Sequence, residues 1–587
     1  MKMWSFSARS GTICTKTVKL QRLLLTDDAK ACPKTAATEA TGVTKTGVLP
    51  VGTSTATETP SSQSMVFTNM SKSPKILDIP CSLTQSHNVS SFDTVPGPHS
   101  LKFISKFWSY VPFLSAEFTA GSLFQVMNLG MFFGNLLSWG GNAKFFQKFF
   151  NVYGPVVRLH GPFGRDVVLL SKPEHACLVL DSKDSQPIRA YLNSLEQYRL
   201  QRCRFRQAKL FLKSSPEWGK IYESLDKSLQ NSPLQHFKTI DLFCDQFIER
   251  IVFIRNLQNE MPKTFKNEVL KWCLECFCCI FISRELGFLH LTGLNSTSDP
   301  GRILDEVIRA FETICKCEYG FHIWKVVQTP ACRTLVRSCD IIDSILGKYV
   351  GEIHSGLIEK KDLKSLVNLS LVESLLLKDD VLVEDAMAVM QDMMLIGTNA
   401  TAHSTAFLLY HLAKNPRCQK KLFDEIMKDP KKLSSPESLK NMPYLQACMK
   451  ESLRLNPPIP ILNRVLGKDV VVHKYQIPKG TYMLIPVHLA CLREEYFEDA
   501  KKFNPERWLS QEISPLAHQL QMFISMPFGR SPKSCQSKEL IQTQLGLLIV
   551  KILKRFIVEY NYGEITSSNA LLATPIQPLN FRFLDRV

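Results

Sequence analysis

The sequence lacks several signatures that would reveal a function directly. It has no phosphate-binding Walker loop, no credible dinucleotide-binding glycine fingerprint and no Ser-His-Asp elbow. It also has no zinc-finger spacing and no RNA-binding aromatic motif, so nucleic acid is not an expected partner. The 18 cysteines are too dilute in 587 residues for a small disulfide scaffold. No internal repeat is present.

Acidic residues are missing from the start of the chain, where the first one is Asp27. The segment before it is basic and rich in Ser and Thr, and it has no apolar core of the length that a secretory signal needs. This composition is typical of a mitochondrial transit peptide, with a plain disordered tail as the alternative. We predict a transit peptide over residues 1–34 and a Ser/Thr-rich disordered linker over residues 35–92.

An uninterrupted membrane-spanning segment is also lacking. Residues 118–143 carry no charge and are long enough to cross a bilayer. Amide side chains such as Gln125, Asn128 and Asn135 interrupt the run, and burying them in hydrocarbon is costly. We expect this segment to dip into one leaflet or to form an internal helix, with a true span as the alternative. Peripheral contact with a membrane follows from the first possibility.

The remaining composition is that of a basic globular protein. Hydrophobic residues make up 45% and charged residues 21%, and the formal net charge is +17. A basic surface favours an acidic partner, such as an anionic membrane or an acidic protein.

Hydrophobic periodicity predicts a mainly α-helical fold with a small β-rich part. The longest helical pattern covers residues 383–414, within a largely helical region over 240–455. The other expected elements are a β-hairpin over 153–170, helices over 444–455 and 537–556, and strands over 469–472, 482–485 and 580–583.

Three separated motifs carry the chemistry. Glu451 and Arg454 are three residues apart on a predicted helix and can pair, and Arg507 follows in a loop as a second guanidinium for the same carboxylate. Cys535 closes the loop that starts at Pro527, just before a long helix. A thiol at a helix N-terminus beside Lys533 favours the thiolate, which is a soft ligand for haem iron.

These motifs, in this order, resemble those of the cytochrome P450 family of haem-thiolate monooxygenases, from about Val95 to the C-terminus. The resemblance implies a haem-thiolate domain over residues 93–587, with haem b between the long central helix and the Cys loop with the last long helix. It also implies a structural triad of Glu451, Arg454 and Arg507, and Cys535 as the axial ligand of the haem iron. The other residues that it assigns to the cofactor are Phe528, Arg464, Trp218 and Lys533.

Within the family, Tyr153-Gly154-Pro155, the segment 198–202 and the segment 408–416 are similar to animal mitochondrial members, particularly arthropod steroid hydroxylases. That class implies a lipophilic, sterol-like or steroid-like substrate and an acidic ferredoxin as electron donor. It implies a location at the matrix side of the mitochondrial inner membrane, with the endoplasmic reticulum membrane as the alternative. Lys420, Lys421 and Lys440 are candidates for docking the ferredoxin.

The chain departs from the family pattern at several positions. On the central helix, Gly397 is present, but Asn399 and Ala400 stand where an acid and a hydroxyl usually relay protons to dioxygen. Thr401 follows, about 100° further around the helix axis, and is only a partial substitute. In the Cys loop, Ser531 and Ser537 replace glycines and Lys533 replaces an arginine, and in an early helix Tyr222 stands where Arg is usual, four residues after Trp218.

Three functions therefore stay open. The first is a monooxygenase with a divergent proton relay that uses Gly397, Asn399 and Thr401. The second is a haem-thiolate isomerase or dehydratase, which needs no activation of dioxygen. The third is a catalytically degenerate protein that keeps the fold as a binding module.

Two further groups are candidate functional sites. Cys273 and Cys276 form a Cys-x-x-Cys, but no second pair follows, so buried thiols are expected rather than a zinc site. His403 lies on the central helix and either faces a substrate or is a polar residue satisfied by its neighbours.

Overall fold

The computed structural model describes residues 89–98, 143–160, 166–180, 192–202, 216–319, 324, 327–359, 369–378, 381–429, 434–509, 520–521, 523–529, 534–569 and 571–586. All of them belong to one structural unit. The expected transit peptide and most of the expected linker lie outside the described residues, as do residues 118–142 of the uncharged run. None of the described helices is both long and apolar enough to cross a membrane.

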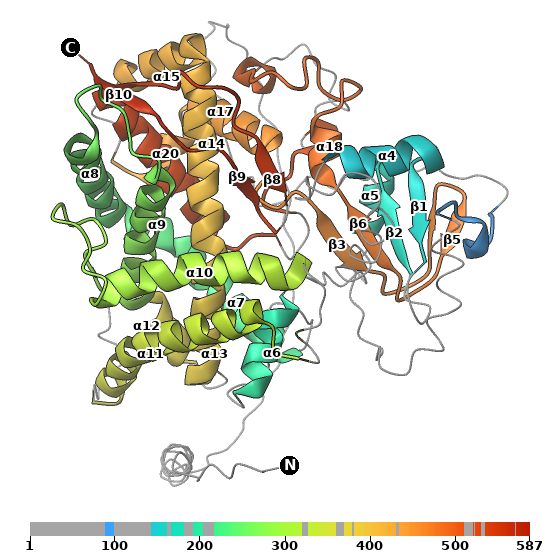
Figure 1. The fold of residues 1–587 in the computed structure, drawn as a ribbon, viewed down its shortest axis with the longest axis horizontal. Coiled ribbons are helices and arrows are strands. Elements are labelled where there is room, and N and C mark those ends of the chain that lie inside the picture. The colour runs from blue at the N-terminus through green and yellow to red at the C-terminus, as the bar shows by residue number, and fades with distance from the viewer. Residues whose placement is uncertain are drawn as a thin grey trace, which may run out of the picture. The chain divides into compact units, whose positions relative to one another are not determined.

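The long periodic pattern forms the central helical element, which runs through the helical part of the molecule (Figure 1). It consists of α13 (Val383–Asp392), a π-helical turn (Met393–Gly397) and α14 (Thr398–Lys414). Nearly all residues of α14 are buried, so the helix is enclosed on nearly all sides. The sequence predicted both ends of this pattern, whereas the π turn was not expected.

Other helices pack around α14 and form the main hydrophobic core. Among them, α10 and α11 lie along each other, α9 packs against α14, and α20 packs against α8. The bounds are α6 (Asn193–Gln201), α7 (Pro216–Gln235), α8 (Phe237–Ile254), α9 (Phe265–Ile282), α10 (Asp299–Tyr319), α11 (Pro330–Glu359), α12 (Leu371–Leu376), α15 (Pro416–Lys428), α16 (Pro436–Lys440), α17 (Pro443–Leu455), α18 (Val487–Cys491) and α20 (Lys538–Arg555).

Prolines set the limits of the helix that carries the first motif. Pro443 stands at the first position of α17, where its missing N–H costs nothing. The helix ends at Leu455, before Asn456 and Pro457. The predicted helix over 444–455 is therefore confirmed to within one residue.

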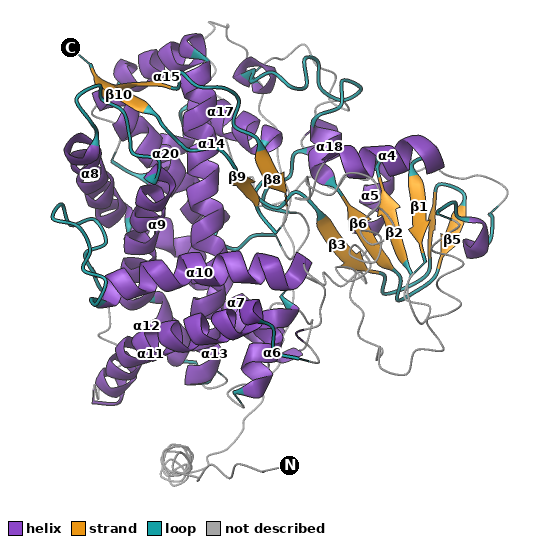
Figure 2. Ribbon diagram, in the orientation of Figure 1, coloured by secondary structure: helices purple, strands orange, loops and turns teal. Residues whose placement is uncertain are grey.

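The β-rich part is built on a four-stranded sheet with the order β1-β2-β6-β3, which lies beside α4 (Ala143–Tyr153) and α5 (Pro173–Leu180), apart from the helices around α14 (Figure 2). The predicted hairpin is confirmed as the antiparallel pair β1 (Val156–Leu159) and β2 (Val167–Leu170). The second strand runs parallel to β6 (Tyr482–Ile485), which pairs antiparallel with β3 (Leu462–Val465). The remaining strands are β4 (Val470–Val472), β5 (Tyr475–Ile477), β7 (Phe556–Glu559), β8 (Ser567–Asn569), β9 (Ala573–Pro575) and β10 (Arg582–Asp585).

Alternate residues of the hairpin face two separate cores. Val168 and Leu170 belong to one apolar cluster, whereas Val167 and Leu169 belong to another that includes aromatic residues of α4. The sheet is thus covered on both faces. Ser90 pairs with Tyr475 of β5, so the chain joins this part of the fold within the last residues of the segment expected to be a linker.

Candidate active site

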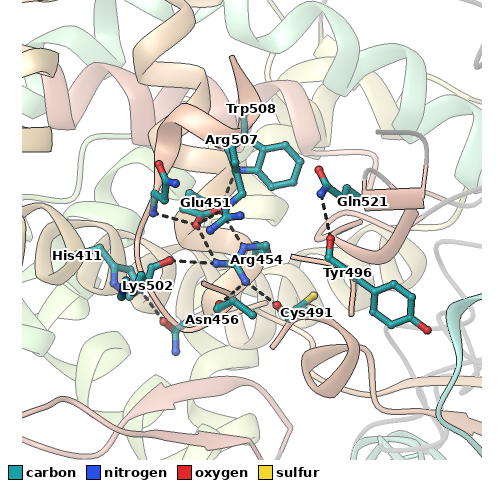
Figure 3. Close-up of polar contacts among 12 residues, drawn as sticks. His411, Glu451, Arg454, Asn456, Cys491, Tyr496, Lys502, Arg507, Trp508 and Gln521 are labelled. Atoms are coloured by element: carbon teal, nitrogen blue, oxygen red, sulfur yellow. Dashed lines mark hydrogen bonds and ion pairs between the residues drawn. The ribbon is translucent and has the colours of Figure 1, made fainter. Parts of the chain in front are cut away.

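A buried carboxylate, Glu451, is the centre of the polar network that the first two motifs form (Figure 3). Its Oε1 accepts from Arg454 Nη2 at 2.8 Å and from Arg507 Nε at 3.0 Å, and its Oε2 accepts from Arg454 Nε at 2.9 Å. The indole N–H of Trp508 donates to Oε2 at 2.9 Å, and the backbone N–H of Asn504 donates to Oε1 at 3.0 Å. The helix α17 and the 3-10 turn η8 (Pro505–Trp508) together place the three charges that the sequence singled out.

Arg454 extends the network to the backbone that follows α18. Its Nη1 donates to Cys491 O at 2.5 Å and to Ala500 O at 2.7 Å, and its guanidinium lies 4.8 Å from the centroid of the Phe497 ring. Both Glu451 and Arg454 are 0% exposed. Burial alone would raise the pKa of Glu451, but the hydrogen bonds and charges of Arg454 and Arg507 outweigh it and hold that pKa below its ordinary value.

The Cys loop is closed by a short hydrogen bond. The backbone N–H of Cys535 donates to Phe528 O at 2.7 Å, and Gly529 between them adopts φ +74°, which glycine tolerates without strain. Cys535 is half-buried and its carbonyl accepts from the N–H of Lys538, where α20 begins. The thiol therefore stands ahead of a helix N-terminus, as the motif requires. Lys533 lies outside the described residues.

The other expected cofactor residues are only partly defined. Arg464 lies on β3 opposite Met483 of β6, is half-buried, and donates from Nη1 to Asn463 O at 2.7 Å. Trp218 falls within α7, in the part of that helix whose side chains are not described, and so does Tyr222.

The polar residues expected on the central helix bond within that helix. Asn399 Nδ2 donates to Leu395 O at 2.8 Å, and Thr401 Oγ1 donates to Gly397 O at 2.9 Å. Gly397 ends the π turn, in which the N–H of Thr398 reaches back five residues to Met393 O. Such turns occur often at functional sites.

The π turn shifts the side chains of α14 around the helix axis, so different residues of α14 line up with a given face of α13. A single π turn acts as the insertion of one residue, so every later residue is rotated back by about 100°. Relative to α13, Thr401 therefore takes the direction that residue 400 would have in an uninterrupted helix. No sequence pattern predicts this change.

His403 has polar and aromatic neighbours from two other elements. Its Nδ1 lies 3.3 Å from Thr574 Oγ1 of β9, and its ring meets Phe311 of α10 edge-on at a centroid distance of 5.7 Å. Burial, with a smaller effect of Lys266, lowers its pKa to about 3, so the imidazole is neutral at physiological pH. These contacts agree with the interpretation of a satisfied polar residue.

The cysteines of α9 are buried, as predicted. Cys273, Cys276 and Cys278 are shielded from solvent, and Cys279 is half-buried. Burial raises the pKa of all four thiols, so they stay protonated and inert.

A buried ion pair outside the motifs was missed by the sequence interpretation. Arg199 of α6 pairs with Asp392, the last residue before the π turn, and both side chains are 3% exposed. Tyr198 beside it donates to Asp343 Oδ2 of α11 at 2.8 Å. The only signal was that these two residues of α6 lie in a segment similar to the mitochondrial class.

These described residues fit haem as the cofactor. Cys535 differs from the cysteines of α9 because it lies in a loop directly ahead of a helix N-terminus, where a thiolate is stabilised. Arg464 is a half-buried cation on β3, suited to a carboxylate of the porphyrin.

Such a site defines a haem-thiolate oxidoreductase, and comparison with known proteins agrees. Residues 125–583 match the sequence model of the family described as cytochrome P450. The chain belongs to this family, and its cofactor is haem b.

Insect proteins are among the relatives of the chain. The chain is 28% identical to "Probable cytochrome P450 49a1" of Drosophila melanogaster, over 85% of this chain and 83% of that protein. It is 31% identical to "Cytochrome P450 CYP12A2" of Musca domestica, over 74% and 84% respectively. It is 25% identical to "Cytochrome P450 302a1, mitochondrial" of Drosophila melanogaster, over 82% and 92%. The expected likeness to arthropod mitochondrial members is therefore confirmed.

Proposed function

We propose that this haem monooxygenase inserts one oxygen atom of O2 into a lipophilic, sterol-like or steroid-like substrate, with electrons from an acidic ferredoxin. The observation that carries the proposal is the Cys535 loop, closed onto Phe528 ahead of α20. Several insect relatives are named mitochondrial, which supports the electron donor and the location at the matrix side of the inner membrane.

The residues of this chain have distinct roles in the proposed reaction. When bound, haem supplies the redox chemistry of oxygen activation. Cys535 is the iron ligand, and Arg464, Trp218, Phe528 and Lys533 hold or flank the porphyrin.

Proton delivery is one step at which this chain departs from the family pattern. Asn399 carries an amide that cannot donate a proton as an acid, and Ala400 has no hydroxyl. A hydroxyl can accept one proton while it donates another, and Thr401, which directly follows the two altered positions, carries a hydroxyl. The π turn supports Thr401 in this role because it rotates that residue into the direction of position 400. We therefore assign the relay to Thr401, aided by water or by a hydroxyl of the substrate.

The relay is tested by comparing Thr401→Val with Thr398→Val. Thr398 lies on the same helix and donates to Met394 O, so its replacement removes a buried hydroxyl of the same kind. Loss of proton delivery costs about 100-fold or more in a step that depends on it. We expect product formed per O2 consumed to fall strongly in Thr401→Val and to stay within about twofold in Thr398→Val. Equal coupling in both variants would exclude Thr401 from the relay.

A second function is favoured by one observation. The Asn399 amide is satisfied within the helix by Leu395 O, so this position supplies no acid for oxygen chemistry. A haem-thiolate isomerase or dehydratase does not need one. Oxygen uptake with a ferredoxin, its reductase and NADPH separates the two functions, because the isomerase converts substrate without consuming O2. The Cys535→Ala variant is the control that removes haem-thiolate chemistry in both cases.

The proposed ferredoxin surface is refined by ion pairs. Lys421 Nζ lies 2.5 Å from Glu506 Oε1, and Lys440 Nζ lies 2.6 Å from Glu539 Oε2. Lys420 is exposed, and the described residues give it no acidic partner. Its charge is therefore the most available of the three candidates for steering an acidic protein.

Substitutions at Lys420 and Lys440 test this surface. Lys420→Glu should weaken ferredoxin binding several-fold and reduce its dependence on salt. Lys440→Gln should change binding less, because that lysine is already neutralised within the chain. Unchanged binding and salt dependence in Lys420→Glu would place the electron donor elsewhere.

A further inference from the structure

His411 lies in the last turn of α14 and contacts two segments that flank the Glu451 network (Figure 3). Its Nε2 lies 2.8 Å from Asn456 Oδ1, and its ring stacks on Phe503 with centroids 5.1 Å apart and planes at 3°. The imidazole is buried, which lowers its pKa to about 4. At neutral pH it is uncharged, and in the tautomer protonated at Nε2 it donates to Asn456.

Both partners of His411 are joined directly to the network. Asn456 follows Arg454 by two residues, and its N–H donates to Ser452 O at 2.9 Å. Phe503 immediately precedes Asn504, whose N–H donates to Glu451 Oε1. A shift of either partner therefore moves a residue that positions the buried charges.

The network is connected in turn to the segment that leads into the Cys loop. Arg454 holds the carbonyl of Cys491, and the thiol of Cys491 donates to Ile524 O at 3.5 Å. Gln521 Nε2 donates to Tyr496 O at 3.0 Å, and Ile524 packs in one apolar cluster with Trp508. Ile524 is four residues before Phe528, which accepts the N–H of Cys535.

We propose that His411 is a positioning residue that couples the central helix to the Glu451 network. It thereby keeps the Cys loop correctly placed relative to the part of the central helix at the oxygen side of the haem pocket. The same helix carries Thr401, ten residues earlier or about 15 Å along the axis. His411 thus links the central helix, which carries Thr401 of the proposed proton relay, to the Cys loop, which carries the iron ligand Cys535. It rests on haem-thiolate binding and not on the identity of the substrate.

The test separates the hydrogen bond from the packing. His411→Phe keeps a flat ring against Phe503 and removes the hydrogen bond, and Asn456→Ala removes the same bond from the other side. Asn456→Asp keeps an acceptor oxygen and serves as the rescue variant. Leu412→Val, one residue along α14 and 0% exposed, is the control for a general loss of packing.

The readout is the carbon monoxide spectrum of the chemically reduced holoprotein in mild urea, followed as the thiolate band converts to the thiol band. Loss of one buried hydrogen bond predicts about tenfold faster conversion in His411→Phe and in Asn456→Ala. Because both variants break the same bond, the double variant should be no faster than either single one. Asn456→Asp should convert at close to the rate of the unmodified protein.

Two results would overturn the proposal. One is conversion in Leu412→Val as fast as in His411→Phe when their free energies of unfolding are equal, since the effect would then be general instability. The other is additive acceleration in the double variant, which would show that the two residues act separately. The assay needs no substrate and no electron partner, so a protein without monooxygenase activity still gives a clear answer about His411.

Discussion

Replacing Glu451 with Gln tests whether this one buried carboxylate stabilises the segments that its network joins. Glu451 accepts five hydrogen bonds from four residues, and two of those donors are the guanidinium groups of Arg454 and Arg507. The variant removes the negative charge that Arg454 and Arg507 share. It also places an amide NH2 group against the groups that donate hydrogen bonds to the carboxylate. Removing one partner of a buried ion pair lowers the free energy of unfolding by about 3–5 kcal/mol. That is a large share of a typical stability of about 5–15 kcal/mol.

The matched control lies in the next motif along the chain. Glu506 precedes Arg507 and pairs with Lys421 in a solvent-exposed bridge, with side chains 40% and 58% exposed. Glu506→Gln should therefore cost less than about 1 kcal/mol. Urea unfolding of the haem-loaded proteins, followed by circular dichroism and by the Soret band, measures both effects. If Glu451→Gln lowers the free energy of unfolding by less than about 1 kcal/mol, the network does not stabilise the fold as its contacts predict.

The pH dependence of the same pair of proteins gives an independent check. The pKa of Glu451 is lower in the folded protein than its ordinary value of 4.5, so its contribution to stability is complete above pH 4.5. That contribution is lost as the pH falls through the folded-state value. The unmodified protein should therefore lose its advantage over Glu451→Gln when both are acidified below pH 4.5. An advantage that stays constant at acidic pH would contradict the assigned pKa shift.

Three further predictions address buried groups outside this network. Asp392→Asn removes the carboxylate that pairs with the buried guanidinium of Arg199 and should cost about 3–5 kcal/mol, with faster amide hydrogen exchange in α6; unchanged exchange there would show that the pair does not hold that helix. His403→Leu should lessen the loss of stability between pH 6.5 and pH 4.5, because burial lowers the pKa of the folded imidazole to about 3, so in this range only the unfolded protein binds a proton at His403 and unfolding is favoured; parallel pH profiles would contradict this. Gln419→Ala should cost about 1–3 kcal/mol in urea unfolding, since the amide bonds both backbone groups of Val558, and a neutral result would mean that water replaces it.

Local chemistry explains which elements the sequence predicted well. The strand over Tyr482–Ile485 is marked by a short apolar run, and the start of the helix at Pro443 is marked by proline; both signals act within a few residues. The pairing of Glu451 with Arg454 is also local, because i and i+3 share one face of a helix. The stop of the central helix before Asn415 and Pro416 follows from the same rules.

Long-range contacts explain what the sequence did not predict. His411 and Asn456 are separated by 45 residues, and Arg199 and Asp392 by 193. Such pairs depend on how helices pack and leave no periodic signal. The π turn is invisible for another reason, since Met393–Gly397 continues the apolar pattern of the flanking helices and only the backbone register changes. The ion pair of Lys421 likewise appears only when α15 and η8 are brought together.

The two parts of the site respond differently to substitution, and this explains how the relay motif could change while the triad stayed intact. Losing one charge of the Glu451 network leaves another buried charge unpaired, which lowers the stability by several kcal/mol. Asn399 instead satisfies its own amide through Leu395 O, and Ala400 is an excellent helix former, so both departures leave the helix stable. An intact triad is therefore a sign of a stable haem-binding fold and says little about proton delivery. We therefore propose that proton delivery depends on Thr401, whose direction relative to α13 is set by the π turn.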